Sequence, residues 1–393
     1  MRRSTIVFSL LIVGIGVAFS MAARFGIPMR ALPPPGGVLI GAVTDAATGA
    51  SRPDLFSGSH QRVVPFQMLY PAAVAGAYAP YMPDAEPQID AIVKSHGWMS
   101  RVLLGRIGTL GAPWTDAAKP VAGGPFPVII YLPGVTGYMQ MGSFQTTELA
   151  AQGYVVVTLN QPGAVAAVVL RDHQIILGLT RADAAAVIAP SYLATNQPLP
   201  GRLAKGLAPE RSIVPYFAAD VGLVLDRLAE INADPAHILH GMLDLDHVGL
   251  MGMSLGAIVT AQACATEVRI RACLMMDAPV PTEVASTGLR QAALWISRPA
   301  EDQRLERAAS GGWPENEIDA QAATINEALS NSDHGQLVQL NGLFHIDFTD
   351  LPALQPALGW LGQSGPTGIF EAHRQINELA KAFFATTIGT AKT

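Results

Sequence analysis

The sequence predicts an α/β protein in which a mostly parallel central sheet carries helices on both faces. Two continuous apolar runs, 127–132 and 154–159, are typical of strands buried on both faces, and the segment 142–153 between them is long enough for a crossover helix. Strands and helices continue to alternate up to a final amphipathic helix around 369–383. In such a sheet the active groups are expected at the carboxyl ends of the strands.

Each further element follows from a local pattern. Runs at 38–43 and 63–70 are rich in β-forming residues and predict strands that join the sheet in an antiparallel arrangement. The segment 77–124 is rich in Pro, Gly and Ala and gives no clear assignment beyond a near-helical spacing of apolar residues from Trp98 to Leu110. The remaining elements expected are a helix over 216–231, a strand over 247–252, a helix over 255–266, and strands over 270–276, 292–297 and 336–340.

Composition limits the classes of protein that the chain can belong to. Its 393 residues include 25 Lys and Arg against 31 Asp and Glu, a formal charge of −6, which argues against a nucleic-acid partner. Half of the residues are hydrophobic and 14% are charged, as in a globular rather than a disordered chain. The two cysteines exclude a disulfide-rich scaffold and an all-cysteine zinc site. Cys264 and Cys273 are expected either to form a disulfide or to remain two buried thiols.

The first residues have the features of a targeting segment. Arg2 and Arg3 precede an uncharged stretch from Ser4 to Ala23, and a helix of this length would span a bilayer core. Residues 1–23 are therefore interpreted as a signal peptide or an N-terminal membrane anchor, residues 24–37 as a linker, and residues 38–393 as a single folded domain. Both interpretations of the first segment predict that the protein works outside the cytoplasm.

The most informative motif is Gly252-Met253-Ser254-Leu255-Gly256, which follows an apolar strand directly and precedes a helical stretch. This is the pattern of a nucleophile elbow, in which a serine sits on a strained turn between strand and helix. Side chains two residues before or after the serine would collide in that turn, so glycine is needed there. Ser254 is the predicted nucleophile.

A serine needs a base, and the base needs a carboxylate that orients it. Of the histidines after Ser254, His334 precedes its strand and His373 lies in the terminal helix, where we expect it to be solvated. His345 follows the strand and is the predicted base. Two acids remain candidates on the residues alone: Asp277 has an apolar setting, and Asp302 lies in a charged run that looks solvated.

The developing oxyanion needs hydrogen-bond donors. The backbone N–H of Leu255, at the start of a helix, is one predicted donor, and that of Val135, in the loop after the strand at 127–132, is the other. No glycine-rich phosphate loop and no Cys/His ligand spacing is evident, so no cofactor or metal is expected. The set His345, Asp347 and Asp350 offers a single histidine with two carboxylates on a loop, a weak pattern for a metal site.

Four segments together resemble a known family: VGLMGMSLGA around the elbow, LMMDAPV, GLFHIDFTD and PFPVIIYLPGVTGY. They are similar to the α/β-hydrolases related to the plasma type of platelet-activating factor acetylhydrolase and to related bacterial serine esterases and lipases, from about Arg62 to the terminal helix. The resemblance implies an α/β-hydrolase fold and selects Asp277 over Asp302 as the acid. Pro133 stands where the family usually has His, and Ala257 where a third Gly is common.

The resemblance also implies calcium-independent hydrolysis of short or oxidised acyl chains from phospholipids and related esters. A small-molecule or lipid ester is therefore the expected partner, contact with a membrane surface is compatible with it, and the oligomeric state is open. Two alternatives stay open as well. The same three residues would serve a polyester, dienelactone-like or general carboxylesterase, and a catalytically silent member of the fold would bind a hydrophobic ligand.

Overall fold

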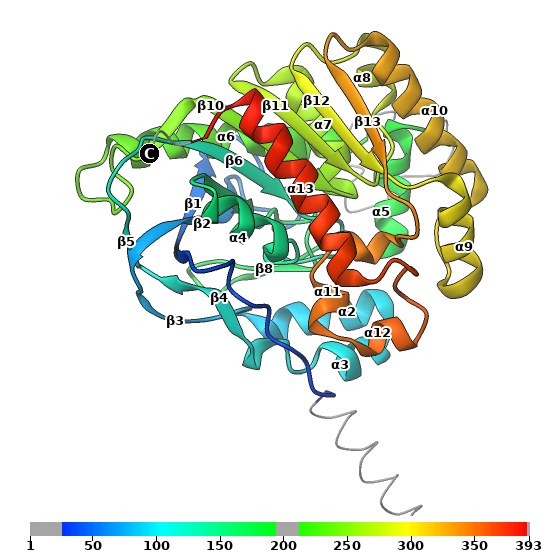
Figure 1. The fold of residues 1–393 in the computed structure, drawn as a ribbon, viewed down its shortest axis with the longest axis horizontal. Coiled ribbons are helices and arrows are strands. Elements are labelled where there is room, and N and C mark those ends of the chain that lie inside the picture. Colours follow the sequence, from blue (N-terminus) through cyan, green and yellow to red (C-terminus); the bar gives the residue numbers. More distant parts are fainter. Residues whose placement is uncertain (1–25, 194–211, 391–393) are drawn as a thin grey trace, which may run out of the picture.

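The computed structural model describes residues 26–193 and 212–390, and in this part of the chain one large mixed sheet is covered by helices (Figure 1). The strands are β1 (Leu39–Gly49), β2 (Arg62–Val74), β3 (Ala77–Pro80), β4 (Gly111–Asp116), β5 (Lys119–Pro120), β6 (Phe126–Leu132), β7 (Val155–Leu159), β8 (Ala167–Val169), β9 (Ile175–Leu177), β10 (Leu243–Met253), β11 (Ile270–Met276), β12 (Ala292–Ser297) and β13 (Gly335–Gln339).

The α-helices are α2 (Ala85–His96), α3 (Met99–Leu104), α4 (Ser143–Ala151), α5 (Arg181–Ile188), α6 (Val214–Ala233), α7 (Leu255–Thr266), α8 (Thr282–Thr287), α9 (Ala300–Ser310), α10 (Glu315–Asn331), α11 (Leu351–Leu354), α12 (Ala357–Trp360) and α13 (Ile369–Thr387). Three 3₁₀ turns join them: η1 (Ile107–Thr109), η2 (Ala189–Ser191) and η3 (His345–Phe348).

The order of the strands confirms the predicted fold class. The main sheet runs β13-β12-β11-β10-β6-β7-β2-β1-β4-β3, and the six strands from β13 to β7 are mutually parallel. β2 pairs antiparallel with both β7 and β1, as expected for the strands that lead into the sheet. β6 and β7 are buried along their whole length, because helices cover both faces.

Helices pack on the two faces of this sheet. Figure 1 shows α4 and α13 in front of the sheet, with α6 and α7 behind it. α6 contributes the predicted apolar stripe, with Phe217, Val221 and Leu228 fully buried. The two apolar layers fix the sheet, and the carboxyl ends of β10, β11 and β12 therefore lie at one edge, where Ser254, Asp277 and Arg298 follow them.

The segment 77–124 folds into more structure than the sequence indicated: it contains β3, α2, α3, η1, β4 and β5. Part of the predicted linker lies against this region, because Ile27 N–H donates to Val102 O (2.9 Å) and Arg30 N–H donates to Leu354 O (2.7 Å). The predicted targeting segment, residues 1–23, lies outside the described residues. Across residues 26–193 and 212–390, none of the helices has the length and apolar character needed to span a membrane.

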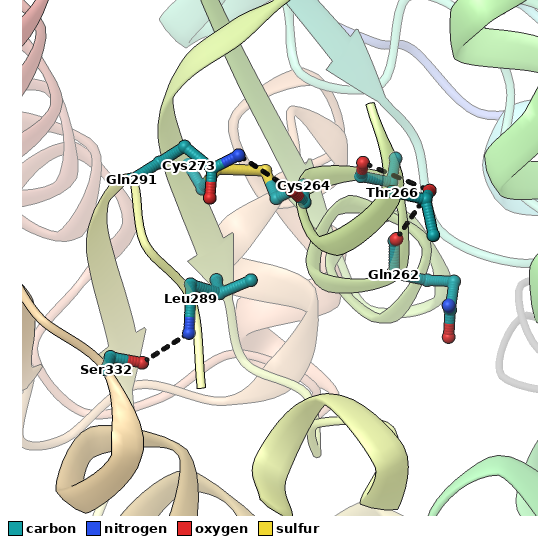
Figure 2. Close-up of a disulfide and its surroundings, with 8 residues drawn as sticks. Gln262, Cys264, Thr266, Cys273, Leu289, Gln291 and Ser332 are labelled. Carbon is teal, nitrogen blue, oxygen red and sulfur yellow. Dashed lines mark hydrogen bonds between the residues drawn. A yellow bond between two sulfur atoms is a disulfide. The ribbon is translucent and has the colours of Figure 1, made fainter. Parts of the chain in front are cut away.

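Cys264 and Cys273 form a disulfide, the first of the two arrangements expected for them. Figure 2 shows that it joins the last turn of α7 to the middle of β11, and that the Gln291 side chain reaches the same turn. There Gln291 Nε2 donates to Cys264 O at 2.8 Å. The disulfide therefore links the helix that begins directly after Ser254 to the strand that ends directly before Asp277.

Candidate active site

Ser254 lies in a sharp turn between β10 and α7. Its φ of 57° falls in the left-handed region, which a residue other than glycine rarely adopts. The two flanking glycines are required by close packing, since a Cβ on Gly252 would lie 2.2 Å from Gly256 O, and a Cβ on Gly256 would lie 2.0 Å from Leu132 O. The motif thus has the strand, turn and helix that its sequence pattern predicts.

Asp277 and His345 are hydrogen-bonded to each other, with His345 Nδ1 at 2.6 Å from Asp277 Oδ2. Asp277 comes directly after β11, and its backbone is also in the left-handed region, with φ 48°. Its N–H donates to Ile296 O of the neighbouring strand at 2.8 Å, which fixes this strained residue in place. The bond leaves Nε2 as the histidine nitrogen that faces away from the acid.

A buried arginine that the sequence analysis missed shares this carboxylate. Arg298 follows β12, and its Nε donates to the same Asp277 Oδ2 at 2.8 Å. Its Nη1 donates to Glu306 Oε2 at 2.7 Å, and Glu306 Oε1 in turn accepts the His345 N–H at 3.1 Å. Arg298 therefore connects the acid to the backbone of the histidine through Glu306.

The charges of this network keep Asp277 ionised. Burial by itself would raise the pKa of Asp277, but the Arg298 guanidinium and the hydrogen bond from His345 hold it well below its usual range. Gln321 Nε2 approaches the other carboxylate oxygen at 3.3 Å. Asp277 is thus an anion with every oxygen partnered, which suits a group that orients an imidazole and does not take its proton.

Ser254 and His345 line the same cavity, and the structure records no hydrogen bond from Ser254 Oγ among the residues it describes. Apo sites often have such loose contacts, which tighten when substrate binds. Asp277 and His345 are therefore joined directly, and Ser254 shares a cavity with His345.

The loop after β6 lies against the serine. A Cβ on Gly134 would be 3.1 Å from Ser254 Cβ, so the backbones approach closely here. Thr136 N–H is occupied by Ala164 O at 2.9 Å. The Leu255 N–H, at the first position of α7, has no acceptor within its own helix. Val135 and Leu255, the two residues whose N–H groups the sequence predicts as oxyanion donors, both line a cavity that Ser254 lines.

Two cavities meet at Ser254 and His345. The first has a volume of about 600 Å³ and a mainly apolar wall, which includes Ile92, Leu103, Met141, Met253 and Leu358. The second has a volume of about 440 Å³ and is lined by Ile258 and Trp313 together with the carboxylates of Glu306 and Glu317. An ester whose carbonyl lay at Ser254 could place one half in each cavity.

The structure corrects one sequence-based expectation. His373 is not solvated: it is buried, its ring stacks on Phe144 with centroids 3.7 Å apart, and its Nε2 lies 3.0 Å from Thr349 O. Burial lowers the pKa of His373 to about 4, against the hydrogen bond to Thr349, so its ring is neutral at pH 7. The amphipathic pattern showed which side of α13 is apolar. It did not show that the Thr349 carbonyl oxygen, from another segment, would face His373.

The other candidates have structural roles. Asp302, the alternative acid, is half-buried and accepts the Gly342 N–H at 2.7 Å, so it stabilises the turn before His345. Asp347 accepts the Phe344 N–H at 2.7 Å. Asp350 accepts the Phe144 N–H at the start of α4, and burial raises its pKa to about 6. Within the described ranges, no three His, Cys, Asp or Glu side chains are grouped to hold a metal ion.

The sequence analysis did not identify two further residues at the cavity wall, His96 and Trp313. His96, at the end of α2, has Nε2 at 2.8 Å from Thr136 Oγ1, and Thr136 has a left-handed φ of 56°. Trp313 places its ring edge toward His345, with centroids 5.4 Å apart. Neither lies in a motif, because both reach the site from loops or helices whose position depends on tertiary packing. The left-handed backbones of Ser254, Asp277 and Thr136 are a further mark of this region, because strained residues cluster at functional sites.

Comparison with known proteins supports the fold. No family model matches the sequence, and no curated protein matches it. Among solved structures, a ferulic acid esterase from Streptomyces cinnamoneus is similar, with a TM-score of 0.68 and 20% sequence identity over 92% of this chain and 94% of that chain. At this identity the likeness shows the fold alone. The chain has an α/β-hydrolase fold, as the sequence predicts.

Proposed function

We propose that the protein is a serine carboxylic-ester hydrolase. One arrangement carries the proposal: Asp277 holds His345 at 2.6 Å on the wall of a cavity that is also lined by Ser254, whose backbone is strained at φ 57°. A positioned histidine with an ionised carboxylate behind it and a serine on the wall of the same cavity are the parts that acyl transfer requires.

In the first step Ser254 Oγ attacks the ester carbonyl while His345 Nε2 takes the hydroxyl proton. The C–O π pair moves to the oxygen, and the N–H groups of Val135 and Leu255 stabilise the resulting oxyanion. Each such donor contributes about 2.7–4 kcal/mol to the barrier reduction. When the tetrahedral species collapses, the bond to the alcohol oxygen breaks and His345 returns the proton to that oxygen.

In the second step water hydrolyses the acyl-enzyme. His345 removes a proton from the water, the hydroxide oxygen bonds to the acyl carbon, and the bond to Ser254 Oγ breaks with return of the proton to the serine. Asp277 stays ionised throughout, because the Arg298 guanidinium and His345 keep its pKa low. His345 thus serves as base and acid in both steps.

The substrates that we propose are short or oxidised acyl esters of lipids, as for platelet-activating factor acetylhydrolases. The mainly apolar cavity of about 600 Å³, with Met141 and Met253 in its wall, supports an apolar acyl group. A second candidate is a carboxylesterase acting on aromatic acid esters. The similar structure of a ferulic acid esterase and the Trp313 ring in the second cavity favour this candidate.

We also propose that the protein works outside the cytoplasm. The Cys264–Cys273 disulfide supports this location, because disulfides persist mainly in oxidising compartments. The apolar segment of residues 4–23 after two arginines supports it independently.

The function is tested with the full chain, a fluorophosphonate probe and a set of esters. Intact mass should show one adduct, at Ser254, and Ser254→Ala should abolish it. On p-nitrophenyl butyrate we expect Ser254→Ala and His345→Ala to lower kcat/KM by about a million-fold and Asp277→Asn by about 10,000-fold. The matched control, Asp302→Asn, should stay within about tenfold, because Asp302 contacts a turn and not His345.

Two outcomes would overturn the proposal. Loss of activity in Asp302→Asn but not in Asp277→Asn would refute the choice of acid. Protein that forms no adduct and hydrolyses no ester would indicate a silent, ligand-binding member of the fold. Relative rates on an acetyl-glycerophospholipid, on p-nitrophenyl esters of graded chain length and on methyl ferulate separate the two substrate classes.

A further inference from the structure

A further cavity lies against the loop that follows β6. Its volume is about 510 Å³, and its walls come from β1, β2, α2 and the end of β8 as well as from Met139 and Gln140 of that loop. Neither Ser254 nor His345 lines it, so it is separate from the two cavities at those residues. The proposed ester hydrolysis therefore leaves this cavity without a role.

Four carboxamide side chains line this cavity: Gln67, Gln88, Gln140 and Asn160. We therefore call it the carboxamide cavity. Each of the four residues is at most 9% exposed, and the amide oxygens of Gln88, Gln140 and Asn160 are buried with no hydrogen-bond partner in the described part of the chain. Buried polar groups in proteins are nearly always hydrogen-bonded, and an unbonded one costs stability. Three such groups around one cavity have a common explanation if a polar ligand supplies the missing bonds.

The floor of the carboxamide cavity is one face of the β1–β2 pair. Thr44 is paired with Gln67, and Ala46 follows on the same face two residues later. On the opposite face of β2, Val64 and Phe66 belong to the apolar core. The face toward the cavity instead carries short or polar side chains, and these leave space that a ligand can enter.

The charges of the carboxamide cavity argue against an anionic ligand and against a metal ion. Among the described residues, the carboxylates of Asp45, Asp84 and Asp172 line it together with one cation, Arg171. This excess of negative charge repels an anion. Asp45 is already paired with Arg227 at 2.9 Å, and no three His, Cys, Asp or Glu side chains are grouped to hold a metal ion anywhere in residues 26–193 and 212–390.

A neutral ligand with many hydroxyl groups fits this lining. A carboxamide presents donors and an acceptor side by side, and a hydroxyl is donor and acceptor at once, so two adjacent hydroxyls can pair with one carboxamide. The Asp84 carboxylate accepts further hydroxyl protons and needs no cation to do so. Met82 and Met139 give the wall an apolar part, against which the C–H face of a sugar ring can pack.

We propose that the carboxamide cavity binds a neutral saccharide of one or two rings, whose hydroxyls bond to Gln88, Gln140 and Asn160. This is a binding function apart from ester hydrolysis, and it does not depend on Ser254 being the nucleophile. The two sites share a loop, because Gln140 lines the carboxamide cavity and Met141, the next residue, lines the larger cavity at Ser254.

Binding is tested by isothermal titration calorimetry of the full chain with glucose and maltose. We expect a dissociation constant of about 1 mM for the tighter of the two sugars, and a rise in Tm of about 2 °C at ten times that concentration. Glucose 6-phosphate should bind at least about tenfold more weakly than glucose, because the lining repels its charge. The proposal is overturned if neither sugar binds at concentrations up to about 50 mM.

Variants place the bound sugar. Gln88→Met and Asn160→Leu keep the size of the side chain but remove its hydrogen bonds, so each should weaken sugar binding at least about tenfold. Ala46→Phe, on the floor, should fill the cavity and abolish binding. The matched control is Gln145→Met, because the Gln145 carboxamide is equally buried and unpartnered in the described chain but does not line the cavity. Its affinity should change less than about twofold, and equal loss in this control would refute the assignment.

The Tm of the sugar-free variants separates binding from a structural role. Since an unpartnered buried carboxamide costs free energy, Gln88→Met and Asn160→Leu should leave Tm unchanged or raise it while they weaken sugar binding. A lower Tm with unchanged affinity for sugar would show that these carboxamides serve the fold, and the proposal would fail.

Other occupants of the cavity are outcomes of the same titrations. Choline that binds when neither sugar does would make the cavity a site for an organic cation and would refute the saccharide. Ser254→Ala should bind sugar as tightly as the unmodified chain. Sugar binding in a protein that hydrolyses no ester would therefore leave this proposal standing, whereas an active esterase that binds no sugar would overturn it alone.

Discussion

Arg298 is the residue whose removal gives the most informative test of the site. Arg298→Met leaves Asp277 and Glu306 as two buried carboxylates without their shared cation, a change that costs about 3–5 kcal/mol of stability. The double variant Arg298→Met with Glu306→Gln restores the net charge of the group. It also keeps an acceptor for the His345 N–H, so it is expected to fold even if the single variant does not.

The effect on catalysis follows from the shared oxygen. His345 Nδ1 and Arg298 Nε lie 2.6 Å and 2.8 Å from Asp277 Oδ2, so the two nitrogens are no further apart than the sum of these distances. The Arg298 guanidinium therefore stabilises the ionised form of the carboxylate that orients His345, and a cation this close typically lowers a carboxyl pKa by about 1–3.

The assay is kcat/KM on a soluble short ester between pH 5 and pH 9. Without the Arg298 cation the pKa of Asp277 rises toward its usual range, and a protonated Asp277 no longer orients His345, so the acid limb of the profile should move up by about one pH unit or more. The double variant should move less, because loss of the Glu306 carboxylate acts in the opposite direction. Arg304→Met, on the exposed side of α9, is the control. A folded Arg298→Met whose acid limb does not move would refute the electrostatic role.

Three further predictions concern stability and the elbow. Reduction of Cys264–Cys273, which closes a loop of nine residues, should lower the free energy of unfolding by about 2.6 kcal/mol and Tm by about 3 °C in calorimetry, and an unchanged Tm would contradict it. His373 is neutral when folded and takes up a proton below pH 6.5 when unfolded, so the stability it provides is lost as the pH falls. Between pH 7.5 and pH 5 the protein should lose about 2 kcal/mol relative to His373→Gln in urea titrations, and parallel curves would refute this. Gly256→Ala should lower kcat/KM about 100-fold, because its Cβ would lie 2.0 Å from a backbone oxygen, whereas Gly36→Ala, with open space around it, should not.

Local pattern was sufficient for the part of the fold that carries the nucleophile. The elements expected over 255–266, 270–276 and 292–297 have the observed bounds of α7, β11 and β12, because buried parallel strands are continuous apolar runs and turns between them are short. The same reasoning gave no clear assignment for the segment 77–124. Its helix α3 has only six residues, and its position depends on a hydrogen bond between Leu103 and Gln355, 252 residues later in the chain.

In the site, too, features set by local sequence were predictable and features set by tertiary contacts were not. The glycines around Ser254 and the apolar setting of Asp277 are visible in the sequence, since each reflects a local constraint. Arg298 lies beside a charged run and has the composition of a surface residue, and only Asp277 and Glu306, brought together by the fold, explain its burial. His373 was misplaced for the converse reason: its partner, Thr349 O, comes from a separate turn.

The disulfide links the elements that carry Ser254 and Asp277, but it does not include the turn that carries His345. It joins the last turn of α7, the helix that begins after Ser254, to the middle of β11, the strand that ends before Asp277, so the helix of the nucleophile and the strand of the acid are covalently linked (Figure 2). The turn that holds His345 carries no cysteine and is held by noncovalent contacts, among them the hydrogen bonds with Asp277 and Glu306. When the protein is heated gradually, the turn that carries His345 should therefore be the first part of the site to unfold. Activity should vanish while the serine pocket is still intact, and rapid cooling should restore it without refolding of the sheet.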